Sequence, residues 1–96
     1  MNELDEILEI EELKWRKKSF DELIANTNKT YCYYTEHKSQ KYQFEIHRNG
    51  SESSEEIVIM VEASKDSFFG NFSGKARYFV KSKSNVTRDI RDNEAF

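Results

Sequence analysis

Four stretches of the chain alternate apolar with polar side chains, and this two-residue period is typical of β-strands that bury one face. They cover residues 31–36, 42–48, 57–63 and 76–80, and short polar segments connect them. Ahead of them, apolar side chains recur at helical spacing through residues 3–26. The sequence therefore predicts an α+β fold of two layers, in which an N-terminal helix or helix pair packs on one face of a four-stranded antiparallel meander.

The helical segment contains a signal for a second helix start. Ser19 followed by Glu22 matches a capping box, in which each side chain accepts a hydrogen bond from the other residue's backbone N–H. The polar residues 26–28 are then expected to end the helical stretch, because their side chains compete for backbone hydrogen bonds. One long helix that drifts across the sheet and two helices that meet near Lys18 both fit the pattern, and the capping box favours a break.

The 96 residues are enough for one hydrophobic core but not for two independent ones. Apolar residues make up 36 % of the chain and aromatic residues 14 %, which is typical of a folded domain and not of a disordered segment. We therefore expect a single domain that consists of a helical segment at 1–27, a sheet at 30–82 and a polar tail at 83–96.

The four predicted strands differ in the number of faces that they bury. The second strand is apolar on one face only, whereas the third is apolar on both faces for most of its length. The first and fourth strands place aromatic side chains on both faces, so either Tyr78 or Phe79 must face away from the helices. Because one helical layer covers one face of a sheet, the other face is expected to expose an apolar patch, which commonly marks an interaction surface.

This second face, together with the loop before the last predicted strand, supplies the candidate binding surface. Its residues are Val58, Met60, Tyr34, Phe79, Phe69 and Phe72. The chain contains no proline, so an edge strand lacks one of the usual guards against pairing with another chain. We expect a small non-catalytic domain that binds another protein or associates with itself as a homodimer.

Two other functions fit parts of the sequence. A sheet that curves around the helix would leave a pocket for an apolar small molecule, although no glycine lies inside a predicted strand to help it curve. The basic residues of the segment 75–91, interleaved with Tyr78 and Phe79, are of the types that contact nucleic acid. The net charge of −3 and the pI of about 5.4 make nucleic-acid binding the weaker alternative.

The motifs that would indicate catalysis or ligand binding are incomplete. A phosphate-binding loop needs four residues between its glycines and a helix after it, but three residues separate Gly70 from Gly74 and a predicted strand follows. The polar face of the sheet is expected to carry Glu45, His47 and Glu62. A histidine beside a carboxylate can act as a general base, but an ordinary solvated strand face explains the same residues. The two histidines have no third ligand at a recognised metal-binding spacing. We expect no catalytic residue, no metal site and no cofactor.

The sequence also bears on the compartment of the protein. Its longest apolar run, at 57–61, is far shorter than the roughly 18 residues needed to cross a bilayer, and residues 1–12 are acidic where a signal peptide is basic. Cys32 is the only cysteine, which excludes an intrachain disulfide, and free cysteines are commonly buried. We expect a cytoplasmic protein without a membrane partner, with Cys32 in its core.

Overall fold

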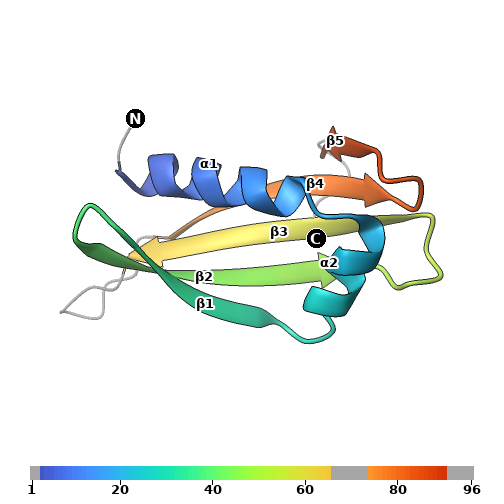
Figure 1. Cartoon of the computed structure of the whole chain (residues 1–96), viewed down its shortest axis with the longest axis horizontal. Helices are drawn as coiled ribbons and strands as arrows, with labels where there is room; N and C mark the ends of the chain where they lie inside the picture. The colour runs from blue at the N-terminus through green and yellow to red at the C-terminus, as the bar shows by residue number, and fades with distance from the viewer. Residues whose placement is uncertain (1–2, 66–73, 91–96) are drawn as a thin grey trace.

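The structure, a computed structural model, describes residues 3–65 and 74–90. Its elements are α1 (Glu3–Arg16), α2 (Phe20–Asn26), β1 (Tyr31–His37), β2 (Gln40–Asn49), β3 (Glu56–Lys65), β4 (Gly74–Ser82) and β5 (Thr87–Asp89). The strands form one sheet in chain order, each antiparallel to its neighbours, and both helices lie on the same face of it (Figure 1). The predicted α+β fold is confirmed, with five strands where four were expected.

The helical segment is broken at the predicted capping box. Ser19 Oγ accepts a hydrogen bond from the backbone N–H of Glu22 at 3.1 Å, and Glu22 Oε1 accepts one from the N–H of Ser19 at 3.2 Å. Asn85 adds a contact from the other end of the chain, because its Oδ1 accepts from the N–H of Phe20 at 2.8 Å. These bonds satisfy N–H groups that a helix start leaves without a helical partner, and the chain therefore forms two helices.

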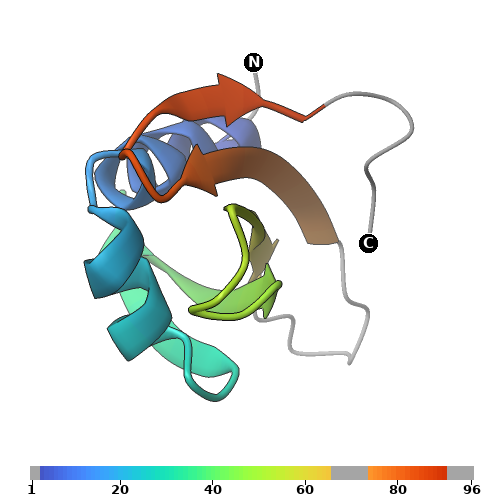
Figure 2. The ribbon, with the colours of Figure 1, turned by 90° about the vertical axis from the view of Figure 1, so that its right-hand side faces the viewer.

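The hydrophobic core lies between the helices and one face of the sheet. Its buried side chains are Leu4, Ile7, Leu8, Trp15, Phe20, Leu23, Tyr42, Phe44, Ile46, Ile57, Ile59, Val61, Ala63 and Phe79. Every second residue of β2 and β3 contributes to it, as the alternation in the sequence predicts. Figure 2 shows that the sheet is bent and that the helices lie on its concave side. Within the described residues, these side chains pack together between the helices and the sheet.

The fifth strand, β5, lies in the segment that was predicted to be a polar tail. It is three residues long and polar, so no alternation of apolar side chains marks it in the sequence. Its position depends on distant contacts. Asp89 pairs with Arg16 of α1 at 2.6 Å, and Asn85, which makes the turn before β5, accepts a hydrogen bond from the N–H of Phe20. Because these contacts join residues far apart in the chain, local pattern cannot predict this strand.

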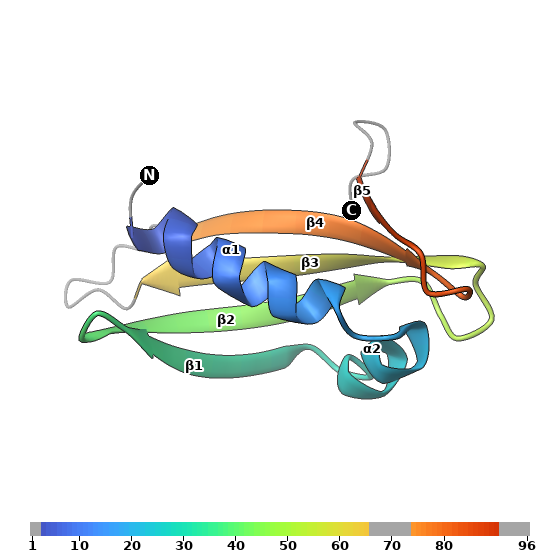
Figure 3. The ribbon, with the colours of Figure 1, turned by 45° about the horizontal axis from the view of Figure 1, so that its top comes forward.

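β1 is an edge strand, and it forms a tight hairpin with β2. All seven of its residues pair with β2, from Tyr31 opposite Ile46 to His37 opposite Gln40. The two residues between the strands, Lys38 and Ser39, have φ values of 52° and 66°, the conformation of a two-residue type I′ turn. Figure 3 shows β1 along the border of the sheet, with no other strand beside its outer edge in the described part of the chain.

No helix within residues 3–65 and 74–90 is long and apolar enough to span a membrane.

Candidate functional site

The face of the sheet that neither helix covers, here called the open face, carries an apolar strip. Val58 pairs with Val80 and Met60 pairs with Tyr78 across β3 and β4, so these four side chains lie on the same face. Val58, Met60 and Tyr78 are half-buried, whereas Val80 is 1 % exposed. The helix-free face of the sheet is therefore apolar at these four positions of β3 and β4.

A bidentate ion pair crosses one end of this strip. Arg88 of β5 donates from Nε and Nη2 to the two carboxylate oxygens of Glu56 on β3, each at 3.1 Å. Since Arg88 pairs with Val80 and Glu56 pairs with Ser82, the Arg88 side chain runs across β4 on the open face. Val80 lies under this crossing and is buried, and the partly exposed members of the strip are Val58, Met60 and Tyr78.

The other residues predicted for the binding surface have different positions. Tyr34 lies on the open face at the outer edge of β1, and 55 % of its surface is exposed. Phe79 does not lie on this face, because it is fully buried in the core on the helix side, and Tyr78 points the opposite way. Phe69 and Phe72 lie outside the described residues. The register of β4 against β3 decides between Tyr78 and Phe79, which the alternation alone left open.

Beside the apolar strip, the structure brings Glu45, His47 and Glu62 together. Glu45 of β2 is directly opposite Glu62 of β3, and His47 is two residues along β2 on the same face. His47 Nε2 lies 3.3 Å from Glu45 Oε2 and 4.0 Å from Glu62 Oε1. One ligand atom from each residue lies within 4.8 Å of the others, and all three side chains are half-buried. The alternation predicts that these residues share one face, and the register makes them one cluster.

The surroundings of this cluster are concave and polar. A hollow of about 300 Å³ next to Glu45 and Glu62 is also lined by Gln43, Ser64 and Gly74. A second hollow, of about 420 Å³, is lined by Thr27, Asn28, Lys29, Thr30, His47, Arg48, Gly50 and Met60. Solvent and small solutes can therefore approach the cluster from two directions.

The remaining histidine and the single cysteine are not part of this cluster. His37 lies at the helix side of the sheet, where its Nε2 is 3.2 Å from Glu6 of α1. Cys32 pairs with Glu45 across β1 and β2, and its sulfur accepts a hydrogen bond from Gln43 Nε2 at 3.2 Å. The expectation that Cys32 is buried is wrong, because its side chain is exposed on an edge strand.

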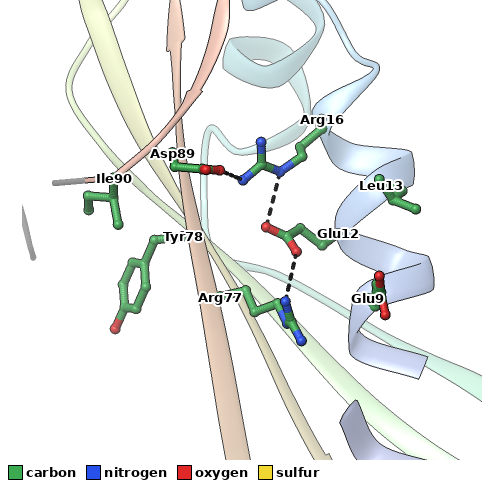
Figure 4. A pocket seen from close by; sticks show the side chains of 8 residues that line it. All are labelled: Glu9, Glu12, Leu13, Arg16, Arg77, Tyr78, Asp89 and Ile90. Atoms are coloured by element: carbon green, nitrogen blue, oxygen red, sulfur yellow. Dashed lines mark hydrogen bonds and ion pairs between the residues drawn. The ribbon is translucent and has the colours of Figure 1, made fainter. Parts of the chain in front are cut away.

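A groove of about 480 Å³ separates α1 from β4 and β5, and Figure 4 shows the charged side chains that cross it. Arg77 lies 3.7 Å from Glu12, Glu12 lies 3.1 Å from Arg16, and Arg16 lies 2.6 Å from Asp89. Burial alone would lower the pKa of Arg16, but its bonds to Asp89 and Glu12 raise the pKa above its usual value. The charges of this network are matched, so we assign it the structural role of joining α1 to β4 and β5.

A second groove, of about 340 Å³, lies between α1 and β1. Trp15 Nε1 donates to the hydroxyl of Tyr33, and that hydroxyl donates to Glu11 Oε1, both at 2.9 Å. Burial and the nearby carboxylate of Glu11 together raise the pKa of Tyr33 above its usual value, although the bond from Trp15 opposes them. This chain of hydrogen bonds fastens β1 to α1 and fixes the position of the edge strand.

The basic residues of the segment 75–91 do not form a continuous strip in the described part of the chain. Lys75 pairs with Asp5 at 2.9 Å and Arg77 with Glu12, both toward α1, whereas Arg88 pairs with Glu56 on the open face. Lys81 is 3 % exposed and donates to the backbone carbonyl of Arg16 at 2.7 Å. These four cations therefore bind groups of this chain on two faces of the sheet and are not aligned as a single strip.

Searches of protein-family models, curated proteins and solved structures gave no match. The function is therefore inferred from the geometry of the open face and of the β1 edge.

Proposed function

We propose that this protein is a non-catalytic protein-binding domain that associates with a second copy of itself through the outer edge of β1. The observation that supports the proposal is that β1, a seven-residue edge strand of the described sheet, has few of the usual guards against pairing. It contains no proline, its pairing with β2 has no bulge, and Glu36 is its only carboxylate. Natural edge strands are commonly shortened, bulged or charged, which prevents such pairing. β1 is neither short nor bulged, and it carries little charge.

The hairpin determines which backbone groups of β1 point outward. In a two-residue turn the flanking pair, His37 and Gln40, is hydrogen-bonded, and pairs in an antiparallel ladder alternate between bonded and non-bonded. Counting back along β1, the N–H and C=O groups of Cys32, Tyr34 and Glu36 therefore point away from β2. These groups are available to an added strand.

A second β1 fits this edge in one register about a two-fold axis. With Tyr34 opposite Tyr34 of the other copy, each Cys32 lies opposite a Glu36, and all three outward-pointing residues are paired. Such an isologous arrangement uses the same surface on both subunits. A register with Glu36 opposite itself is disfavoured, since like charges directly opposite destabilise a pair of strands.

The dimer would also enlarge the open face. A two-fold axis perpendicular to the sheet joins the two sheets edge to edge, and both open faces then lie on the same side. The strip of Val58, Met60 and Tyr78 would occur twice on this common face, which favours binding of a further protein partner. We favour self-association over binding of a different protein because the outward N–H and C=O groups of β1 define the contacts of the dimer.

The test is the oligomeric state of two matched lysine variants. Tyr34→Lys places like charges opposite each other at the two-fold axis, whereas Cys32→Lys places each lysine opposite a Glu36 of the other copy. We expect a dimer for the unmodified chain, a dissociation constant raised at least about tenfold for Tyr34→Lys, equivalent to about 1.4 kcal/mol, and no weakening for Cys32→Lys.

Sedimentation equilibrium over a range of protein concentrations measures these constants, and far-ultraviolet circular dichroism verifies that both variants fold. A chain that remains monomeric at the highest concentration would contradict the proposal. A dimer that both lysine variants weaken equally would show that association uses a different register or surface.

A further inference from the structure

We propose that Glu45, His47 and Glu62 form a binding site for a divalent transition-metal ion of the zinc type. The site lies on the open face and does not depend on the pairing of β1. Its donor atoms are two carboxylate oxygens and one imidazole nitrogen, supplied by two adjacent strands of the sheet.

The distances suit a small ion after a short movement of the carboxylates. Ligand atoms at about 2.1 Å from a tetrahedral ion lie about 3.4 Å from one another. His47 Nε2 and Glu45 Oε2 are already 3.3 Å apart, and Glu62 Oε1 is 4.0 Å from His47 Nε2. The side chains of Glu45 and Glu62 are 37 % and 44 % exposed, so their terminal torsions can turn to close the site without displacing the core.

The charges of the cluster also favour a cation. Glu45 and Glu62 are directly opposite each other on β2 and β3, and like charges in such a pair destabilise a sheet. His47 contacts both carboxylates but carries at most one positive charge. A divalent cation between the three side chains would neutralise both carboxylates and bind the neutral imidazole, which explains the placement of two facing carboxylates better than a solvated surface does.

The donor set distinguishes between classes of metal. Imidazole nitrogen suits zinc, copper, nickel and iron, whereas magnesium and calcium prefer oxygen ligands alone. Three protein ligands leave one tetrahedral position for water or for a donor of another molecule, as in open zinc sites. The hollows on both sides of the cluster, of about 300 and 420 Å³, provide the room for that fourth ligand.

Zinc titration in competition with a chromophoric chelator tests the site, with magnesium and calcium as comparison ions. We expect one equivalent of zinc per chain, and no competition by the two harder ions at similar concentrations. Glu62→Gln and His47→Gln should each weaken zinc binding at least about tenfold, because each removes one of three ligands. His37→Gln is the matched control, since it removes the other histidine and should leave zinc binding unchanged.

Two further measurements distinguish this site from zinc bound at Cys32 or at scattered surface groups. At the same zinc concentration, zinc should raise the melting temperature of the unmodified chain by more than that of Glu62→Gln, because only the folded state assembles the ligands and the variant binds zinc more weakly. With cobalt in place of zinc, the visible spectrum should show no sulfur-to-metal band. Absence of zinc binding, an equal loss on His37→Gln, or a cobalt–sulfur band that disappears in Cys32→Ser would each overturn the proposal.

Discussion

The hydroxyl of Tyr33 offers a specific test of how the edge strand is held. It accepts a hydrogen bond from the indole N–H of Trp15 and donates one to the carboxylate of Glu11, both at 2.9 Å. Trp15 is 5 % exposed and Glu11 is 4 % exposed, so water replaces these bonds poorly. The substitution Tyr33→Phe removes the hydroxyl and preserves the ring, which is stacked on Phe44 at 5.3 Å between centroids.

The expected cost follows from the groups that lose their partner. A buried donor or acceptor left without a partner costs about 1–3 kcal/mol, and Tyr33→Phe affects one of each. Glu11 retains its ion pair with Lys14 at 2.8 Å, and the half-buried position of Tyr33 lets some water reach the carboxylate. We therefore expect the free energy of unfolding to fall by about 2 kcal/mol, which lies between the loss of one bond and of two.

Urea unfolding at one low protein concentration measures this change, with Tyr31→Phe as the matched control. Tyr31 is 46 % exposed and its substitution should change the free energy of unfolding by less than about 0.5 kcal/mol. For Tyr33→Phe the midpoint should fall by about 1–2 M urea at an unchanged slope. A loss no greater than that of the control would refute the idea that these bonds fasten β1 to α1.

Three more outcomes follow from particular contacts. Ser19→Ala removes the capping box at α2 and should lower the free energy of unfolding by about 1 kcal/mol in urea titrations, whereas Ser84→Ala should have little effect. Hydrogen bonds from Lys75 hold the pKa of Asp5 below its usual value of 3.8. The stability that this carboxylate contributes is therefore present above that pH and is lost as the pH falls through the lowered pKa. In Asp5→Asn, the free energy of unfolding measured against pH should fall less steeply on the acid side. The pKa of Tyr33 is raised mainly by burial, so this hydroxyl ionises at a lower pH in the unfolded chain than in the folded one. The free energy of unfolding should therefore fall as the pH rises above about 10. The fall should be less steep for Tyr33→Phe than for the unmodified chain.

Much of the fold can be predicted because the responsible signals are local. The alternation in residues 42–48 and 57–63 identifies the strands and the side chains that β2 and β3 bury. The capping box at Ser19 and Glu22 identifies the break between the helices. The alternation repeats every two residues and the capping box joins residues three apart, so both can be recognised from neighbouring residues alone.

The features that sequence reasoning missed depend on residues far apart in the chain. β5 is held by Asn85 and Asp89 against the helices, and three polar residues carry no pattern of their own. The choice of Tyr78 over Phe79 for the open face depends on the register of β4 against β3. The single cysteine is exposed because it lies on the open face of an edge strand, and the composition of β1 reveals neither the edge nor the face.

The candidate metal site shows the same division. Sequence reasoning placed Glu45, His47 and Glu62 on one polar face, and the absence of a recognised ligand spacing spoke against a metal ion. The register of β2 against β3 places Glu62 opposite Glu45. Glu62 thereby becomes the third ligand beside Glu45 and His47 of β2. Spacing rules describe ligands on one loop or helix, and a site assembled across two strands escapes them.

Amide hydrogen exchange, followed by NMR at low and high protein concentration, can locate self-association at the outer edge of β1 residue by residue. Pairing of two β1 strands predicts that the N–H groups of Cys32, Tyr34 and Glu36 exchange rapidly at low concentration and become protected together as the concentration rises. The N–H groups of Tyr33 and Thr35, which face β2, should be protected at both concentrations. Equal and rapid exchange of the three outward amides at every concentration would contradict association through β1.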